Sequence, residues 1–432
     1  MRYYSLNNHS PIVDFKTATI AGQAPDMGLY FPKSIPQVDK KFLNDIENYS
    51  KAAIAYKVIK PFVGKVIPDD VLKKIAEETV NFDIPLVQVT ENIFSLELFH
   101  GPTLAFKDIG AKFMSCCLGF FAKERTEKIV VLVATSGDTG GAVANGFYDV
   151  PGIEVVILYP SGKVSNVQEK QLTTLGKNIH AVEVNGSFDD CQKMVKEIFM
   201  DEKLKQKVFL TSANSINVAR WLPQQFYYFF LWKQWQDKNN PPIVSVPSGN
   251  FGNICAGLLA QKTGLPIKHF IAACNANDTV PQFFNTGLYT PKKVVATISN
   301  AMDVGDPSNF IRILEMFNEP QNELKNNLST VSISDKATAE TLLKILNENN
   351  YLLDPHGAVA YNALQTYFTI NPNEKGVILE TAHPVKFYDV IEPITKQAVP
   401  IPTVIAAQLK LEKKSFKMEA DITMLREYLV GL

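Results

Sequence analysis

The sequence predicts an α/β protein in which parallel sheets are covered by helices. From residue 128 onward, short apolar runs rich in β-branched residues alternate with segments of helical periodicity. This alternation is typical of parallel strands joined by crossover helices. The connections are short, apart from a less regular stretch at residues 276–330. A chain built in this way is expected to carry its functional residues in the loops that follow the strands.

The first expected elements form a mixed N-terminal unit. Residues 28–32 read as a strand that ends at proline, and helical patterns follow near residues 40–62 and 68–80. Residues 94–99 alternate like a strand, and residues 109–121 carry bulky apolar side chains at helical spacing. No residues of evident chemistry occur before residue 85.

The alternating part of the chain predicts strands and helices in turn. The expected strands are residues 129–135, 155–159, 179–184, 208–211, 243–246, 269–274 and 377–379. The expected helices are residues 140–148, 166–175, 189–200 and a long helix that reaches Trp235. The aromatic run Phe226–Trp235 is expected in the core or at a domain interface, and residues 400–432 are helix-prone.

Composition sets limits on the partners of this chain. The 432 residues are 46% hydrophobic and 20% charged, with a net charge of −1. This length allows a large core and more than one domain. The charge balance gives no general attraction to nucleic acid or to anionic membranes, so an anionic ligand needs a local site. No stretch is long and apolar enough for a membrane span, and the N-terminus lacks the apolar core of a signal peptide.

Cysteine and histidine usage argues against disulfide and metal frameworks. The five cysteines form no C-x-x-C pair, so we expect reduced thiols in a cytoplasmic protein. The six histidines show no metal-ligand spacing, so no metal site is expected.

A lysine stands at the expected start of one helix, in the stretch His100–Asp108. Asp108 suits a helix start because its carboxylate meets unpaired N–H groups and the positive dipole end. Desolvation and the same field disfavour the ammonium form of Lys107. Most lysines are solvated surface groups, but a neutral amine condenses with aldehydes. Lys107 is therefore a candidate Schiff-base lysine.

Two strand ends run into loops of small residues, Thr135–Gly141 and Ser248–Asn253. Glycine lets the backbone approach an anion, and the first N–H groups of a helix attract phosphate or carboxylate. Neither loop has the glycine spacing of a nucleotide-binding site. A lysine with an anion-binding loop suits a cofactor that bears an aldehyde and a phosphate, and pyridoxal 5′-phosphate has both.

Five segments, taken in order, resemble the motifs of the threonine synthase family. They are His100–Asp108, Thr135–Gly140, Asn214–Asn217, Val246–Gly252 and Thr381–Pro384. The resemblance is to the longer, bacterial and fungal branch of the family, within the pyridoxal-phosphate enzymes of fold type II (tryptophan synthase β-like). It extends from Tyr4 to Asp389. It implies two open, mostly parallel sheet domains flanked by helices, with the cofactor between them, plus an N-terminal accessory domain.

The resemblance also implies roles for single residues. Lys107 is similar to the Schiff-base lysine, and Thr381 is similar to the hydroxyl residue that faces the pyridine nitrogen. The segment similar to the loop around the cofactor phosphate comprises Gly249, Asn250, Phe251, Gly252 and Asn253. The segment similar to the loop near the cofactor ring and the substrate carboxylate comprises Ser136, Gly137, Asp138 and Thr139. Asn253 departs from the family pattern, which usually has Asp there.

Several further residues are open between two interpretations. Either they support the following helix or they bind the substrate phosphate; these are Asn214, Ser215, Asn217 and Arg220. Lys163 and Lys386 are interpreted as surface charges, with anion binding as the alternative. His383 reads equally as a structural histidine or a site residue. Asp303 and Asp306 are interpreted as loop caps rather than metal ligands.

The resemblance implies a cytoplasmic lyase that converts O-phospho-L-homoserine and water to L-threonine and phosphate, the last step of threonine biosynthesis. It would be a monomer or homodimer without nucleic-acid or membrane partners. The expected parts are an N-terminal domain at 1–85, a catalytic region at 86–390 with a smaller subdomain at 128–215, and a helical tail at 391–432.

Two rival functions fit parts of the same pattern. One is a phospho-lyase or dehydratase that gives 2-oxobutanoate on the same scaffold. The other is a non-catalytic relative that keeps the fold as a binding protein. The intact Lys107, both glycine loops and Thr381 argue against the second rival.

Overall fold

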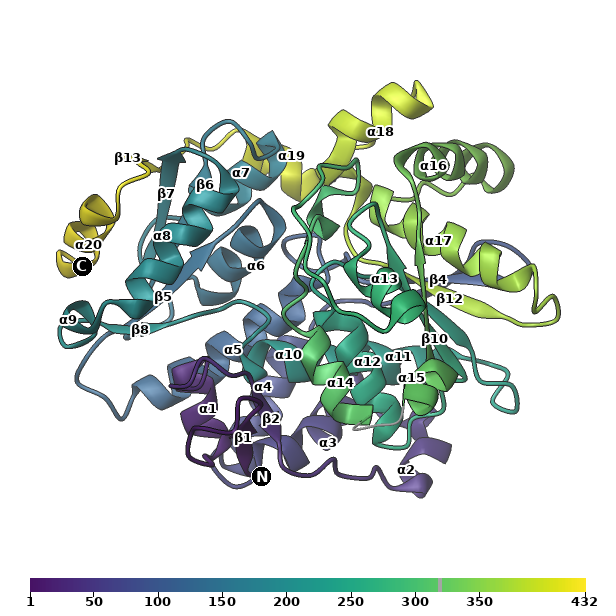
Figure 1. The fold of residues 1–432 in the computed structure, drawn as a ribbon, viewed down its shortest axis with the longest axis horizontal. Coiled ribbons are helices and arrows are strands. Elements are labelled where there is room, and N and C mark those ends of the chain that lie inside the picture. Colours follow the sequence, from purple (N-terminus) through teal and green to yellow (C-terminus); the bar gives the residue numbers. More distant parts are fainter. Residues whose placement is uncertain (318–320) are drawn as a thin grey trace.

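The structure is a computed structural model that describes residues 1–317 and 321–432. Figure 1 shows two α/β halves side by side, with the N-terminal segment (purple) packed below them and the C-terminal segment (yellow) running from one half to the other. Each half is built on its own sheet, of five and six strands. The predicted fold class, with two open and mostly parallel sheets, is therefore confirmed.

The smaller half is built on a parallel sheet in the order β13-β7-β6-β5-β8. Its strands are β5 (Ile129–Ala134), β6 (Ile153–Pro160), β7 (Ile179–Asn185), β8 (Phe209–Thr211) and β13 (Phe416–Glu419). Its helices include α6 (Asp138–Phe147), α7 (Asn166–Thr173), α8 (Phe188–Met200) and α9 (Glu202–Lys205). The central strands are buried on both faces, which explains their continuous apolar runs.

The larger half is built on a sheet in the order β11-β10-β9-β12-β4-β3, in which β3 pairs antiparallel with β4 and the other neighbours are parallel. Its strands are β3 (Leu86–Gln88), β4 (Ile93–Glu97), β9 (Ile243–Pro247), β10 (His269–Cys274), β11 (Leu328–Ser332) and β12 (Gly376–Glu380).

Alternate residues of the larger sheet face opposite layers of helices. Val244 belongs to the same buried cluster as Ile254 of α12 (Gly252–Lys262). Its neighbour Ile243 belongs to the cluster of Leu364 on α17 (Pro355–Phe368). Helix α16 (Asp335–Asn349) packs outside α17. Because successive side chains of a strand point to opposite faces, β9 contributes to the cores on both sides of the sheet.

The N-terminal segment shares its core with the larger half. It contains β1 (Tyr3–Ser5), β2 (Tyr30–Pro32), α1 (Phe15–Ala21), α2 (Lys40–Asn44), η1 (Ile46–Asn48), α3 (Lys51–Val63) and α4 (Asp69–Thr79). The Phe15 ring lies 6.5 Å from that of Phe113 on α5 (Lys107–Ala122). Both belong to one continuous buried cluster, so the segment is anchored beside the helix that Lys107 begins.

The prediction of one continuous helix that reaches Trp235 is wrong. The chain forms α10 (Val218–Trp221), a 3-10 turn η2 (Leu222–Gln224) and α11 (Gln225–Gln234). Pro223 lies in the 3-10 turn, and proline cannot donate the backbone hydrogen bond that a continuous α-helix needs. The aromatic run itself is buried in the core, as predicted.

The less regular stretch and the tail contain more elements than the sequence predicted. The first holds α13 (Thr279–Thr286), η3 (Asn300–Met302), α14 (Phe310–Phe317) and α15 (Gln321–Asn327). The chain ends in η4 (Pro384–Phe387), α18 (Tyr388–Thr395), α19 (Thr403–Leu409), β13 and α20 (Ile422–Val430). Strand β13 was not predicted; it pairs with β7 and buries Met418 in the core of the smaller half.

Across residues 1–317 and 321–432, no helix has the length and apolarity that a membrane crossing requires. Over the same described ranges, no group of three or more histidine, cysteine, aspartate or glutamate side chains is arranged to hold a metal ion.

Candidate active site

A cavity of about 1190 Å³ lies between the two halves, lined also by residues of the N-terminal segment. The carboxyl ends of β5, β9 and β12 supply Thr135, Pro247 and Thr381 to its wall. Parallel sheets place ligand sites at this edge, because the loops after the strands converge there. Both sheets therefore turn their chemistry-bearing loops toward one space.

Lys107 begins α5 at the wall of this cavity. Its side chain is 17% exposed, and Nζ lies 3.4 Å from a carboxylate oxygen of Asp138. The neighbouring backbone is fixed, since Phe106 N–H donates to the Thr381 carbonyl at 2.9 Å. Burial lowers the pKa of Lys107, although the Asp138 carboxylate opposes this effect. The amine form is thereby favoured, as the sequence predicted.

Asp108 lies in the first turn of α5, but its carboxylate does not cap that helix. It accepts hydrogen bonds from Thr103 N–H, at 2.9 Å, and from the Thr103 hydroxyl. Burial raises the pKa of Asp108 to about 6, and these hydrogen bonds oppose the rise. Asp108 therefore shapes the loop that precedes Lys107 instead of binding helix N–H groups.

The loop between β9 and α12 is suited to bind an anion. Helix α12 has no side-chain cap and no acidic residue in its first turn, so its first N–H groups are free to accept a ligand. Phe251 adopts a left-handed backbone (φ 59°), a strained conformation for an aromatic residue. Its buried ring packs against Phe310 at 5.8 Å, and Ser308 N–H donates to the Asn250 side chain at 2.7 Å.

The other glycine loop, between β5 and α6, has a different character. The Thr135 hydroxyl accepts hydrogen bonds from the N–H groups of Gly137 and Gly140, at 3.0 and 2.9 Å. Asp138 adds a carboxylate to the first turn of α6. These features leave fewer free N–H groups for a phosphate and add negative charge to the loop. Ser136 and Thr139 still line the cavity, whereas Gly137 does not.

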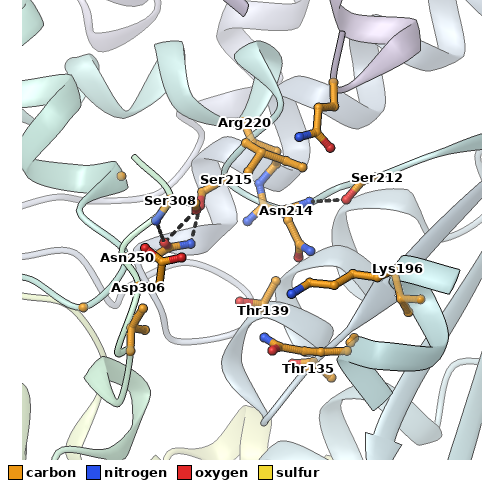
Figure 2. A pocket seen from close by; sticks show the side chains of 18 of the residues that line it. Thr135, Thr139, Lys196, Ser212, Asn214, Ser215, Arg220, Asn250, Asp306 and Ser308 are labelled. Atoms are coloured by element: carbon orange, nitrogen blue, oxygen red, sulfur yellow. Dashed lines mark hydrogen bonds between the residues drawn. The ribbon is translucent and has the colours of Figure 1, made fainter. Parts of the chain in front are cut away.

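Three of the four residues left open near α10 line the cavity, and the fourth does not. Figure 2 shows Asn214, Ser215 and Arg220 around the same space. Arg220 donates to the Ala213 carbonyl at 2.6 Å, and its Nε has no hydrogen-bond partner among the described residues. Burial lowers the pKa of Arg220 to about 10.

Asn217 is fully buried away from the cavity, so the structure does not bring this predicted substrate residue to the site. Its side chain caps α10 by accepting from Ala219 N–H at 3.0 Å. Its amide donates to the carbonyls of Thr19 and Ser212 at 2.9 and 3.3 Å. These bonds support the helix-capping interpretation for this residue.

The interpretation of Lys386 as a surface charge is wrong. Its side chain is 0% exposed, and Nζ lies 2.6 Å from Asp138. The apolar neighbours Pro384, Val385 and Phe387 are the sequence feature that could have indicated burial. Lys163, by contrast, is exposed as predicted.

Lys196 on α8 was not predicted from the sequence. Figure 2 shows its side chain directed into the cavity, toward Asn214 and Thr139. No carboxylate lies within ion-pair distance of its ammonium group in the part of the chain that the structure describes. No feature of the sequence distinguishes this lysine from Lys193, the other exposed lysine of α8.

The remaining predicted residues divide between the cavity and its support. The Asn253 side chain accepts from the Tyr228 hydroxyl at 2.7 Å, and its Nδ2 has no partner among the described residues. His383 caps η4 by accepting from Val385 N–H, and burial lowers its pKa to about 4. Asp303 accepts from the Thr297 hydroxyl at 2.7 Å, which supports a loop-capping role.

Family descriptions cover most of the chain. The family described as pyridoxal-phosphate dependent enzyme matches residues 84–379. The description "Threonine synthase N terminus" matches residues 2–80, and "Threonine synthase, C-terminal" matches residues 357–429.

Individual relatives match over the whole length. The chain is 43% identical to the threonine synthase of Serratia marcescens and 42% identical to that of Escherichia coli strain K12, with 100% of both chains covered in each case. A crystal structure of threonine synthase from Escherichia coli superimposes with a TM-score of 0.92 at 41% identity, covering 100% of both chains. A structure of pyridoxal-phosphate-bound threonine synthase from Brucella melitensis gives a TM-score of 0.93 at 32% identity, covering 100% of this chain and 99% of that one.

The pair Asn217 and Asn214 separates support from ligand binding. We expect Asn217→Ala to lower the free energy of unfolding by about 1–3 kcal/mol, because a helix cap is lost and buried carbonyls lose their donor. Asn214→Ala should change stability by about 0.5 kcal/mol or less while weakening the binding of inorganic phosphate. Urea unfolding and calorimetric titration of both variants measure these effects. A stable Asn217→Ala variant with weakened phosphate binding would contradict this division.

Proposed function

The chain belongs to the threonine synthase family of pyridoxal-phosphate-dependent enzymes, and from this premise we propose that it converts O-phospho-L-homoserine and water to L-threonine and phosphate. The observation that carries this proposal is one cavity that brings together a partly buried lysine amine, an uncapped helix N-terminus and the hydroxyl-bearing Thr381.

The residues of the cavity fit pyridoxal phosphate. The volume of about 1190 Å³ exceeds what a small cofactor and an amino-acid substrate need. A Cβ atom on Gly249 would lie 2.6 Å from the Met302 backbone, so the loop before α12 is closely packed and preshaped. The Nδ2 of Asn253 is a buried donor without a partner among the described residues. When bound, pyridoxal phosphate supplies an electron sink for a carbanion at the substrate Cα.

We assign the cofactor phosphate to the segment Gly249–Asn253. Its helix offers free N–H groups and a positive dipole end without an acidic side chain. The competing loop before α6 carries Asp138 and already uses two of its N–H groups internally. Charge therefore favours the second loop for the phosphate.

We assign two proton roles to Lys107. Its amine would hold the cofactor aldehyde, and as a free amine Nζ would remove the proton at the substrate Cα. The same Nζ returns a proton to Cα before threonine leaves. Removing the proton needs the amine form, which burial favours, and the ammonium form that this step leaves is the one that returns a proton to Cα.

Thr381 serves as the partner of the cofactor ring nitrogen in this proposal. A hydroxyl can donate to a neutral nitrogen without enforcing its protonation, whereas a carboxylate would stabilise the protonated form. Thr381 lies directly after β12 and contacts the Lys107 loop through its carbonyl.

The substrate is held by the rest of the cavity wall. Ser136, Asp138 and Thr139 form the wall for the substrate carboxylate and the cofactor ring, and Gly137 lies behind them in the same loop. Asn214, Ser215 and Arg220 offer donors for the substrate phosphate, and Lys196 adds an ammonium group without an ion-pair partner among the described residues.

The proposed organisation follows the boundaries expected from the sequence: 1–85, 86–390 with a smaller subdomain at 128–215, and 391–432. We propose a cytoplasmic enzyme, monomeric or homodimeric, that acts on a small molecule and has no nucleic-acid or membrane partner. The net charge of −1 and the five free cysteines support this part of the proposal.

Product analysis tests the function against the rival lyase. We expect O-phospho-L-homoserine to give L-threonine in step with phosphate release, because a synthase must admit water to Cβ while keeping bulk water from the cofactor. Chromatographic measurement of L-threonine, 2-oxobutanoate and ammonia distinguishes the two outcomes. Stoichiometric 2-oxobutanoate and ammonia without threonine would show a phospho-lyase on the same site.

Substitution of Gly249 tests the phosphate loop. In Gly249→Ala the added Cβ meets backbone atoms of Met302 at 2.6 Å, so the loop must shift. We expect the dissociation constant for pyridoxal phosphate to rise about 5- to 100-fold, corresponding to an overpacking cost of about 1–3 kcal/mol. Absorbance titration of the cofactor-free chain measures it. Gly431→Ala, whose Cβ would meet nothing closer than 3.6 Å, is the matched control. Equal affinities in the two variants would place the phosphate elsewhere.

A further inference from the structure

Lys386 on η4 is a fully buried lysine to which the proposed reaction assigns no role. Its Nζ lies 2.6 Å from Asp138 Oδ1 and donates to the Thr103 carbonyl at 2.9 Å. Its side chain is 0% exposed, and lysine is seldom buried to this extent unless it is paired. The buried pair of Lys386 and Asp138 therefore needs a functional explanation.

The Asp138 carboxylate is shared between two lysines. Oδ1 meets Lys386 and also accepts from the Gln168 amide at 2.8 Å. Oδ2 lies 3.4 Å from Lys107 Nζ, so the contact with Lys386 is the shorter of the two. Lys107 consequently lies beside a carboxylate whose main ionic partner is a different residue.

We propose that Lys386 is a positioning residue of the reaction, which holds and neutralises the Asp138 carboxylate so that Lys107 has no counter-ion of its own. An unpaired carboxylate at this position would stabilise the ammonium form of Lys107. With the carboxylate neutralised by Lys386, the amine form is favoured, and this form is the one that condenses with an aldehyde and accepts a proton. This inference rests on the proposed role of Lys107.

The charged groups around Lys107 agree with this arrangement. Burial lowers the pKa of Lys107; the Asp138 carboxylate raises it, while the ammonium of Lys386 and the guanidinium of Arg220 lower it. Burial alone would raise the pKa of Asp138, but Lys386, Lys107 and the Gln168 amide outweigh burial and hold that pKa well below its ordinary value.

Two further titratable groups face Lys386. Burial raises the pKa of Asp108 to about 6, and the Lys386 ammonium opposes that rise. Burial lowers the pKa of His383 to about 4, with smaller contributions from His100 and Lys386. The charge on Lys386 therefore acts on several groups, so the test must measure the protonation of the Lys107 amine directly.

The test is the pH dependence of the Lys107 amine in K386M and K386Q. Competitive acetylation with acetic anhydride across a pH series, followed by mass spectrometry of the Lys107 peptide, gives the midpoint at which this amine loses its proton. The measurement uses the full chain freed of cofactor, so it does not depend on turnover. The visible absorption of the holoenzyme is titrated in parallel. K163M, which removes an exposed lysine outside the cavity, is the matched control.

We expect the midpoint to rise by about one pH unit or more in both Lys386 variants and to stay unchanged in K163M. K386Q keeps an N–H donor for Asp138 and for the Thr103 carbonyl but carries no charge, so a rise in K386Q assigns the effect to charge. It also carries the test if K386M fails to fold. An unchanged midpoint in folded K386Q would overturn the inference. Failure of the proposed function would be seen separately, as cofactor bound to a lysine other than Lys107.

Discussion

The cavity depends on one buried carboxylate that is held by two lysines from different parts of the chain. Asp138 begins the first helix of the smaller half, Lys107 begins α5, and Lys386 follows the last strand of the larger sheet. Removing such ions from water is costly unless each charge is paired and hydrogen-bonded. The pairing therefore joins the two halves beside the proposed reaction site, and it fixes the geometry around the Lys107 amine.

The two glycine loops look alike in sequence, but they differ in charge and in the hydrogen bonds that their N–H groups already make. Two N–H groups of the loop before α6 donate to the Thr135 hydroxyl, and the loop leads into Asp138. The loop before α12 has neither a side-chain cap nor an acidic residue, so its positive end is available to a phosphate. The loop before α12 therefore suits the proposed phosphate site, while the carboxylate of the other loop is taken up by Lys386 beside the Lys107 amine.

The sequence predicted the fold class and most strands because the β-branched runs of both sheets are buried on both faces and read as continuous apolar segments. It missed β13 (Phe416–Glu419), a short strand in which Met418 is buried in the core and the other three residues are exposed. Lys107 was found through its neighbours and the family motifs. Lys386 was misjudged and Asn217 was left open because their surroundings are set by residues far away in the chain: Asp138 and Thr103 for the lysine, Thr19 for the asparagine. The spacing of residues along the sequence does not indicate contacts with such distant residues.

The most direct measurement of the central claim locates the cofactor on the chain. Borohydride reduction of the holoenzyme fixes pyridoxal phosphate to the lysine that holds it, and peptide mapping by mass spectrometry then identifies that residue. The partly buried amine beside Asp138 predicts that the modified peptide contains Lys107 and that the remaining lysines stay unmodified. Stoichiometric modification of another lysine, such as Lys196 of the cavity wall, would contradict the account.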